Sequence, residues 1–158
     1  MKKTFPQANN IELMFQSISD LKIDEGETAK DFAERIGFEP REGNYYLDAL
    51  WYIGAVKKES GVYYLSPEGL RIRFMEDYLD KLLAFVHLIL KDEDLKTMYV
   101  ESLQWQDDIT ARKKYYERYI GIHFGLNEVT AHRRASTVHA WFSWMDEVFP
   151  RLAISMKK

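Results

Sequence analysis

Residues 125–145 constrain the fold of this chain more than any other segment. They read GLNEVTAHRRASTVHAWFSWM, and the glycine that opens them predicts the end of one helix. Thr130 is expected to cap the following helix, with His132, Arg133 and Arg134 in its first turn. The buried side of that helix is predicted to contain Ala135, Val138, Trp141, Phe142 and Met145. A helix, a tight turn and a second helix with cationic residues near its start are typical of helix-turn-helix domains that read DNA.

The composition limits the class of protein. With 158 residues the chain can form one average domain or two very small ones, and a hydrophobic fraction of 46% favours a packed core over disorder. The formal net charge of -3 is lower than expected for a protein that only binds DNA. The chain contains no cysteine, which excludes disulfides, thiolate metal sites and cysteine nucleophiles and is typical of a reducing compartment.

No segment predicts export or membrane insertion. The first ten residues, MKKTFPQANN, hold two lysines but no long apolar run, so they do not resemble a signal peptide. The longest apolar run, Leu82–Leu90, is too short to cross a bilayer, and its His87 is expected to be a core histidine. We therefore expect a soluble cytoplasmic protein with no membrane partner.

The apolar pattern of the first half predicts a winged helix over residues 1–75. Thr28 and Gly37 have the spacing of an N-cap and a helix stop. The expected element order is three helices and then a two-stranded β-hairpin. The helices are predicted over 11–18, 28–37 and 44–53, and the hairpin strands over 55–58 and 62–65.

A long connecting helix and a helical bundle are expected to follow. Ser66 and Pro67 predict the start of the connecting helix, which would extend over about residues 68–90. The second domain, over 76–158, is predicted to contain helices over 94–105, 110–124 and 127–149. The expected fold class is therefore mainly α, with an N-terminal winged helix (three helices plus a β-hairpin), a long connecting helix and a C-terminal helical helix-turn-helix bundle.

Residues 112–139 form a basic segment in an acidic chain, with six Lys and Arg residues against two acids. Cations on the helix before a reading helix suit DNA phosphates, and the candidates there are Arg112, Lys113, Lys114 and Arg118. The candidates on the reading helix are Thr130, His132, Arg133 and Arg134, with the two arginines dividing contacts to a base edge and a phosphate. The alternative is an ordinary charged helix face, with one arginine paired with Glu128.

A second set of candidates lies in the first half of the chain. Its reading helix is expected to present Asn44, Tyr45, Asp48 and Tyr52 outward, and its wing Lys57 and Lys58. Asparagine and tyrosine can contact bases and phosphates, whereas aspartate suits only a cytosine amino group. A packing or dimer face is the alternative for this surface.

Neither a metal site nor a catalytic site is expected. His132 and His139 are seven residues apart on one helix face, with no third ligand close in sequence. The chain has no Gly-rich phosphate loop, no nucleophile elbow and no HExxH motif. The predicted strand region over 55–65 also lacks the acid and acid-x-lysine pattern with which nucleases hold magnesium. We therefore expect a protein that is not an enzyme and holds no cofactor.

Two segments resemble known DNA-recognition modules. Residues 41–69, REGNYYLDALWYIGAVKKESGVYYLSPEG, are similar to the pattern R-Q-x-x-Y-Y…A…Y-L-G-L…Y-x-L-T-x-x-G. Residues 130–144, TAHRRASTVHAWFSW, are similar to T-x-x-R-R-A-x-T-V-x-x-W-x-x-W. Both segments resemble the winged-helix and helix-turn-helix modules found with type II restriction endonucleases. Glu42 replaces the glutamine of the first pattern, and no segment of these 158 residues resembles the nuclease domain that accompanies such modules.

The resemblance implies recognition of double-stranded DNA without cleavage by this chain. It points to Arg41, Tyr45, Tyr46, Arg133, Arg134 and Thr137, of which Tyr46 and Thr137 could equally be packing residues. We expect sequence-specific binding of duplex DNA, as the recognition part of a restriction system or as a transcriptional regulator. A second copy of the chain or a nuclease is the expected protein partner.

Two other functions compete with DNA recognition. A protein-interaction module without DNA binding is favoured by the acidic total and by an aromatic content of ten Tyr, nine Phe and four Trp. A catalytic subunit with an unrecognised site is the third option. Salt dependence separates the first two, because DNA binding weakens steeply as salt rises and an apolar interface does not.

Overall fold

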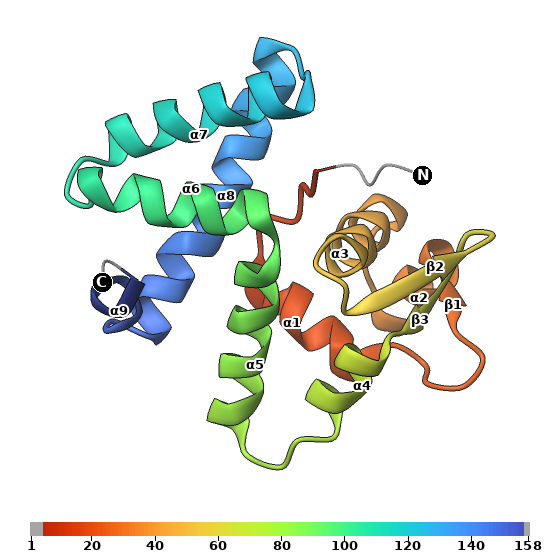
Figure 1. The fold of residues 1–158 in the computed structure, drawn as a ribbon. Coiled ribbons are helices and arrows are strands. Elements are labelled where there is room, and N and C mark those ends of the chain that lie inside the picture. The colour runs from red at the N-terminus through yellow and green to blue at the C-terminus, as the bar shows by residue number, and fades with distance from the viewer. Residues whose placement is uncertain (1–4, 157–158) are drawn as a thin grey trace. The chain divides into compact units, whose positions relative to one another are not determined.

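The computed structural model describes residues 5–156 as a mainly helical protein with one small antiparallel sheet (Figure 1). The described chain divides into two compact units. The first contains residues 5–8 and 12–89, and the second contains residues 9–11 and 90–156. None of the helices within residues 5–156 is long and apolar enough to cross a membrane.

The first unit combines the sheet with five helices. The helices are α1 (Ile11–Asp20), α2 (Ala29–Ile36), α3 (Pro40–Tyr52), α4 (Pro67–Arg73) and α5 (Tyr78–Lys91). The strands are β1 (Glu27–Thr28), β2 (Val56–Glu59) and β3 (Val62–Leu65), which pair antiparallel in the order β1-β3-β2. Ser60 and Gly61 connect β2 to β3 with φ angles of 50° and 78°, the left-handed conformation that a tight hairpin turn requires.

Capping residues set two helix starts of the first unit as predicted. The Thr28 hydroxyl accepts a hydrogen bond from the Asp31 N–H (3.1 Å) at the start of α2. The Ser66 hydroxyl accepts likewise from the Gly69 N–H (3.1 Å) at the start of α4. Gly37 then ends α2 with a φ of 93°. The two helix starts could be predicted from the sequence because each capping hydroxyl bonds an N–H only three residues further along the chain.

Two features of the first unit differ from the predicted pattern. α3 begins at Pro40 and not at residue 44, because proline suits the first helical position and Glu39 forms a capping box with Glu42. The sheet also contains β1, in which Glu27 pairs with Tyr63. A strand of two residues carries no alternating pattern that a sequence could reveal. The hairpin strands lie within one residue of their predicted positions.

The single long helix predicted over 68–90 is wrong, because two helices occupy this stretch. α4 ends at Arg73, whose Nη1 donates to the Ile18 carbonyl (3.3 Å) at the end of α1. α5 then starts independently, with the Asp77 carboxylate accepting a hydrogen bond from the Asp80 N–H (3.0 Å). The chain changes direction between the two helices, in the light-green loop at the bottom of Figure 1.

Packing between α1 and α5 places residues 76–89 in the first unit, whereas the predicted domains of 1–75 and 76–158 assign them to the second. The ring centroids of Phe15 and Phe85 are 5.1 Å apart across this contact. His87 is exposed, so its predicted place in the core is wrong. Two residues after Phe85, it lies on nearly the opposite side of the helix.

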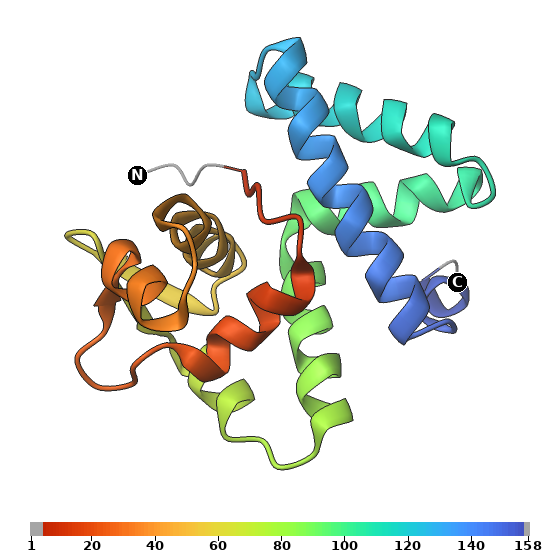
Figure 2. The same cartoon turned by 180° about the vertical axis from the view of Figure 1, so that it is seen from behind.

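The second unit contains no strand among the described residues. It consists of α6 (Glu93–Ser102), the short 3-10 helix η1 (Leu103–Trp105), α7 (Ile109–Phe124), α8 (Glu128–Val148) and α9 (Leu152–Met156). Figure 2 shows α8 as the long blue helix that follows α7. The Phe142 ring packs between those of Tyr99 and Tyr116, at centroid distances of 5.0 and 5.5 Å. The five apolar residues predicted on the buried side of α8 are all buried, which confirms that part of the prediction.

Candidate nucleic-acid interface

A tight turn joins α7 to α8 within residues 125–145. Gly125 ends α7 in the left-handed conformation (φ 62°), and only residues 125–127 separate the two helices. Asn127 caps α8, because its side-chain oxygen accepts a hydrogen bond from the Thr130 N–H (2.9 Å). The predicted cap at Thr130 is therefore wrong: asparagine is at least as good a cap as threonine, and it starts the helix earlier.

The earlier start moves the predicted reading residues along α8. The helix begins at Glu128, so Thr130 is its third residue and is half-buried. His132, Arg133 and Arg134 consequently lie in the second turn and not in the first. Residues beyond the first turn can still face a groove, but they no longer act from the helix end.

Four of the predicted cations are exposed on the α7–α8 pair. Lys113, Lys114 and Arg118 lie on α7, and Arg133 lies on α8. Lys114 and Arg118 are four residues apart and therefore follow one face of α7. They line an open pocket of about 480 Å³ together with Glu117 of α7 and with Glu128 and Ala131 of α8. These ammonium and guanidinium groups are accessible to an anionic partner.

Arg112 is not accessible, and its predicted phosphate contact is wrong. The residue is 6% exposed, because its place four residues before the buried Tyr116 turns it toward the core of the second unit. Its Nε donates to the Tyr116 hydroxyl (3.2 Å), and its Nη1 lies 3.8 Å from the Asp146 carboxylate. Arg112 is thus a core residue with an ionic partner.

Thr137 is also inward-facing, so its predicted DNA contact is wrong. It is fully buried, and its hydroxyl donates to the Asn9 side-chain oxygen. Asn9 belongs to the short segment 9–11, which lies in the second unit although the flanking residues belong to the first. Thr137 is therefore a packing residue, the alternative role expected for it.

The two histidines of α8 have different surroundings. His132 is exposed, and its Nδ1 lies 3.2 Å from the carboxylate of Glu117, one of the two acids near the exposed cations. Burial lowers the pKa of His139, and the nearby Lys113 and Arg112 lower it further. No group of three or more metal-ligating side chains occurs between residues 5 and 156. Arg134 is half-buried.

Two apolar residues at the same end of the α7–α8 pair were not among the sequence candidates. Ile122 is 71% exposed and Val129 is 70% exposed. Helical spacing could have revealed the first, because Ile122 follows Arg118 by four residues. Apolar side chains beside cations can contact thymine methyl groups as well as protein surfaces.

The first unit presents a weaker set of candidates. Arg41, Asn44 and Lys57 are exposed and Tyr45 is half-buried, but Tyr46 is buried. Lys58 forms an ion pair with Asp48 (3.1 Å). This ion pair engages the ammonium group of Lys58, so its role as a wing cation stays a prediction. Asp48 also accepts a hydrogen bond from the Tyr63 hydroxyl.

Charge is distributed unevenly between the units. Within the described residues the second unit contains nine Lys and Arg residues against ten Asp and Glu residues, whereas the first contains nine against 15. The acidic total of the chain therefore comes mainly from the first unit. An anionic partner is better matched to the second unit.

Comparison with known proteins gives a family. A family model described as Domain of unknown function (DUF7226) matches residues 16–149, which include most of both units. The chain belongs to this family. No curated protein and no solved structure matches the chain significantly. The DUF7226 match covers α1 from Gln16 to the end of α8, so the candidate interface lies inside the family domain.

Proposed function

We propose that this protein binds double-stranded DNA through the α7–α8 pair. The observation that carries the proposal is the exposure of Lys113, Lys114, Arg118 and Arg133 on two helices joined by a three-residue connection. Only two acids, Glu117 and Glu128, accompany these four cations in the segment 112–139. Glu117 is already engaged by His132.

The exposed residues divide into two roles. Lys113, Lys114 and Arg118 anchor the phosphate backbone, since α7 would cross it as the first helix of a helix-turn-helix does. Arg133 reads a base edge from α8, because its planar guanidinium can donate two parallel hydrogen bonds to guanine. Val129, one turn earlier and 70% exposed, can meet a thymine methyl group in the same groove.

The first unit is proposed to be a winged helix that adds a secondary contact. Its order of helices followed by the β2–β3 hairpin supports this assignment. α3 would present Arg41, Asn44 and Tyr45, and the hairpin would present Lys57. The acid surplus of this unit makes the contact weaker than that of α7 and α8. The protein would act as the recognition part of a restriction system or as a transcriptional regulator.

A titration of the whole chain against a duplex pool at two salt concentrations tests the proposal. Fluorescence anisotropy should show affinity falling steeply between about 50 and 200 mM salt, because each neutralised phosphate adds about 0.9 to the slope of log K against log salt. The triple variant Lys113→Gln, Lys114→Gln and Arg118→Gln should bind more weakly and reduce that slope by about 2 to 3.

A matched variant controls for the loss of charge alone. Lys30→Gln, Lys96→Gln and Arg151→Gln removes the same number of exposed cations from α2, from α6 and from the turn before α9. It should bind like the wild type apart from a small uniform loss. Equal losses for the two triple variants, or salt-independent binding by the wild type, would contradict the proposed interface and favour a protein-interaction module.

A further inference from the structure

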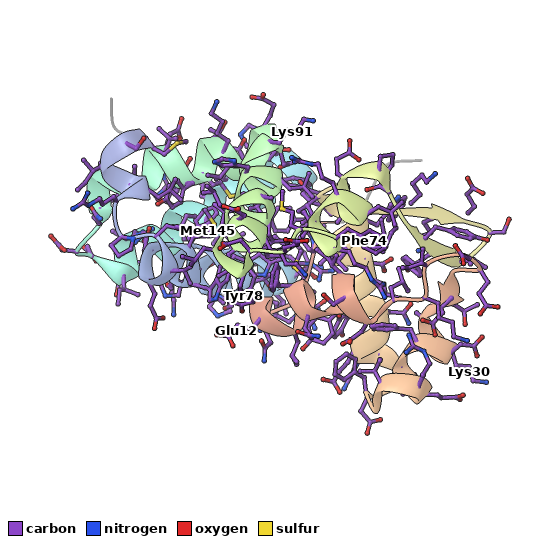
Figure 3. The ribbon with its side chains drawn as sticks, turned by 90° about the horizontal axis from the view of Figure 1, so that it is seen from below. Glu12, Lys30, Phe74, Tyr78, Lys91 and Met145 are labelled. Carbon is purple, nitrogen blue, oxygen red and sulfur yellow. The ribbon has the colours of Figure 1, made fainter. Side chains whose placement is uncertain are left out.

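The segment from the end of α4 to the middle of α5 exposes a cluster of apolar side chains. Of the nine large hydrophobic residues that are exposed between residues 5 and 156, four lie within 74–83. They are Phe74 (66% exposed), Tyr78 (63%), Leu79 (63%) and Leu83 (38%). Figure 3 labels Phe74 just after α4 and Tyr78 at the start of α5. Single exposed apolar residues are common, but a contiguous group marks an interaction surface.

A groove beside this cluster presents a carboxylate and an imidazole in a fixed order along α5. The open pocket of about 550 Å³ is lined on α5 by Asp80, Leu83 and His87, and before α5 by Arg71, Glu76 and Asp77. Asp80, Leu83 and His87 follow the helical spacing i, i+3 and i+7, so they share one side of the helix. Neither Asp80 nor His87 forms an ion pair within residues 5–156.

We infer that a second copy of this chain covers this face, with the two α5 helices antiparallel about a two-fold axis near Leu83. In this arrangement Asp80 of each copy lies beside His87 of the other, and Leu83 meets its own counterpart. A parallel arrangement would place Asp80 against Asp80 and His87 against His87. The order of the acceptor Asp80 and the donor His87 on α5 therefore selects the antiparallel pair.

Symmetry makes the surface complementary to itself. A two-fold axis forms each contact twice, so one carboxylate and one imidazole on α5 supply two hydrogen-bonded pairs to the dimer. Leu79 and Phe74 extend the apolar contact away from the axis. The second copy supplies the acid, the base and the apolar residues at matching spacing. This dimer does not depend on DNA, and its tests are carried out without DNA.

The absence of cysteine from the chain allows a direct test of the axis. Leu83→Cys places a thiol near the proposed axis, where mild oxidation should link two copies because their thiols can approach within disulfide distance. Val129→Cys, at a residue that is 70% exposed on α8, reports random collisions. The first variant should form the covalent dimer much faster than the second. Equal rates, or no dimer from Leu83→Cys, would overturn the proposal.

Sedimentation equilibrium of the whole chain tests the energetics. The wild type should rise from the chain mass of 18.7 kDa toward twice that value between about 1 and 200 μM. Leu79→Glu should raise the dimer dissociation constant about tenfold or more, because it buries a charge in an apolar contact. Circular dichroism of each variant confirms that the fold is retained.

Charge reversal tests the pairing itself. Asp80→Lys and His87→Glu should each weaken the dimer about tenfold. The first removes the carboxylate that accepts from the partner's imidazole, and the second places two carboxylates together at both symmetric positions. The double variant again places complementary groups together and should dimerise like the wild type. Asp107→Lys, an exposed acid in the turn before α7, should have no effect. A wild type that stays monomeric at every concentration, or a double variant as weak as the single variants, would overturn the antiparallel dimer.

Discussion

The Arg112 guanidinium lies inside the second unit, with its Nη1 3.8 Å from the Oδ2 of Asp146. Asp146 also accepts a hydrogen bond from the Tyr99 hydroxyl (2.7 Å), and Arg112 Nε donates to the Tyr116 hydroxyl (3.2 Å). These contacts join α6, α7 and α8. The next residue, Lys113, is exposed, so adjacent cations of one segment have separate roles.

Replacing Arg112 and Lys113 one at a time should show that the first residue stabilises the fold and that the second contributes to DNA binding. Arg112→Gln should lower the free energy of unfolding by about 1–3 kcal/mol, because the buried side chain loses its hydrogen bond to Tyr116 and its ionic contact with the half-buried Asp146. Its folded form should bind duplex DNA like the wild type. Lys113→Gln should change stability by less than about 0.5 kcal/mol and weaken DNA binding. Urea denaturation and anisotropy measure the two effects, and similar behaviour of the two variants would contradict the assignment.

Arg133 is the residue proposed to read a base. Arg133→Ala should cost about 1–3 kcal/mol of binding free energy and relax the preference at one base pair. Arg133→Lys keeps the charge but loses the planar fork. It should therefore retain the salt dependence of the wild type while losing the preference. Selection from a random duplex pool measures both, and an unchanged preference for either variant would remove Arg133 from the reading role.

Glu27 should make the first unit sensitive to acid. Burial raises the pKa of this carboxyl, but hydrogen bonds from the Arg35 side chain and the Lys22 N–H outweigh burial and leave the pKa below its ordinary value of 4.5. A carboxyl with a lowered pKa stabilises the folded state above the unfolded pKa, and this contribution is lost as the pH falls through the folded pKa.

The variant Glu27→Gln measures that contribution. Its free energy of unfolding at neutral pH should be about 1–3 kcal/mol lower than that of the wild type, because Arg35 loses a charged acceptor. The difference from the wild type should shrink as the pH falls below about 4.5. Thermal unfolding at a series of pH values gives the comparison. Glu34→Gln, an exposed acid on α2, should show no such trend, and a difference that stays constant with pH would argue against the ionised pair.

Gly69 has no room for a side chain. A Cβ at this position would lie 2.1 Å from the Ala55 carbonyl oxygen, so Gly69→Ala should destabilise the first unit by about 3 kcal/mol or more. Gly125→Ala offers the contrast, because nothing lies within 4 Å of its added Cβ and only its φ of 62° is strained. That variant should cost about 1 kcal/mol. Equal melting temperatures for the two variants would contradict this steric account.

Local signals made much of the secondary structure predictable. The Thr28 cap and the Gly37 stop of α2 depend on residues close in sequence, and the structure contains both. The same holds for the buried side of α8, because its apolar residues repeat at helical spacing. The break between α4 and α5 was missed, since the apolar pattern continues past Arg73 while the Arg73 hydrogen bond to Ile18 is long-range.

The candidate site was only partly predictable, because the direction of each side chain depends on neighbours in space. Helical spacing could have revealed that Arg112 is buried, because it precedes the buried Tyr116 by four residues. The same spacing relates Thr137 to Trp141. Lys58 of β2 pairs with Asp48 of α3, ten residues earlier in the chain. No local sequence pattern predicts this contact. Selecting DNA-contact candidates by charge alone therefore included residues whose side chains are engaged within the protein.

The short segment 9–11 gives the molecule an unusual connectivity. Since this stretch is embedded in the second unit while the residues on both sides belong to the first, the chain passes between the units more than once. A single cut near residue 90 would consequently leave residues 9–11 on the fragment that carries the first unit. A fragment that starts at residue 90 would lack Asn9, the acceptor of the buried Thr137 hydroxyl. The smallest autonomous version of the second unit is thus expected to need residues 9–11 supplied in trans or grafted onto its end.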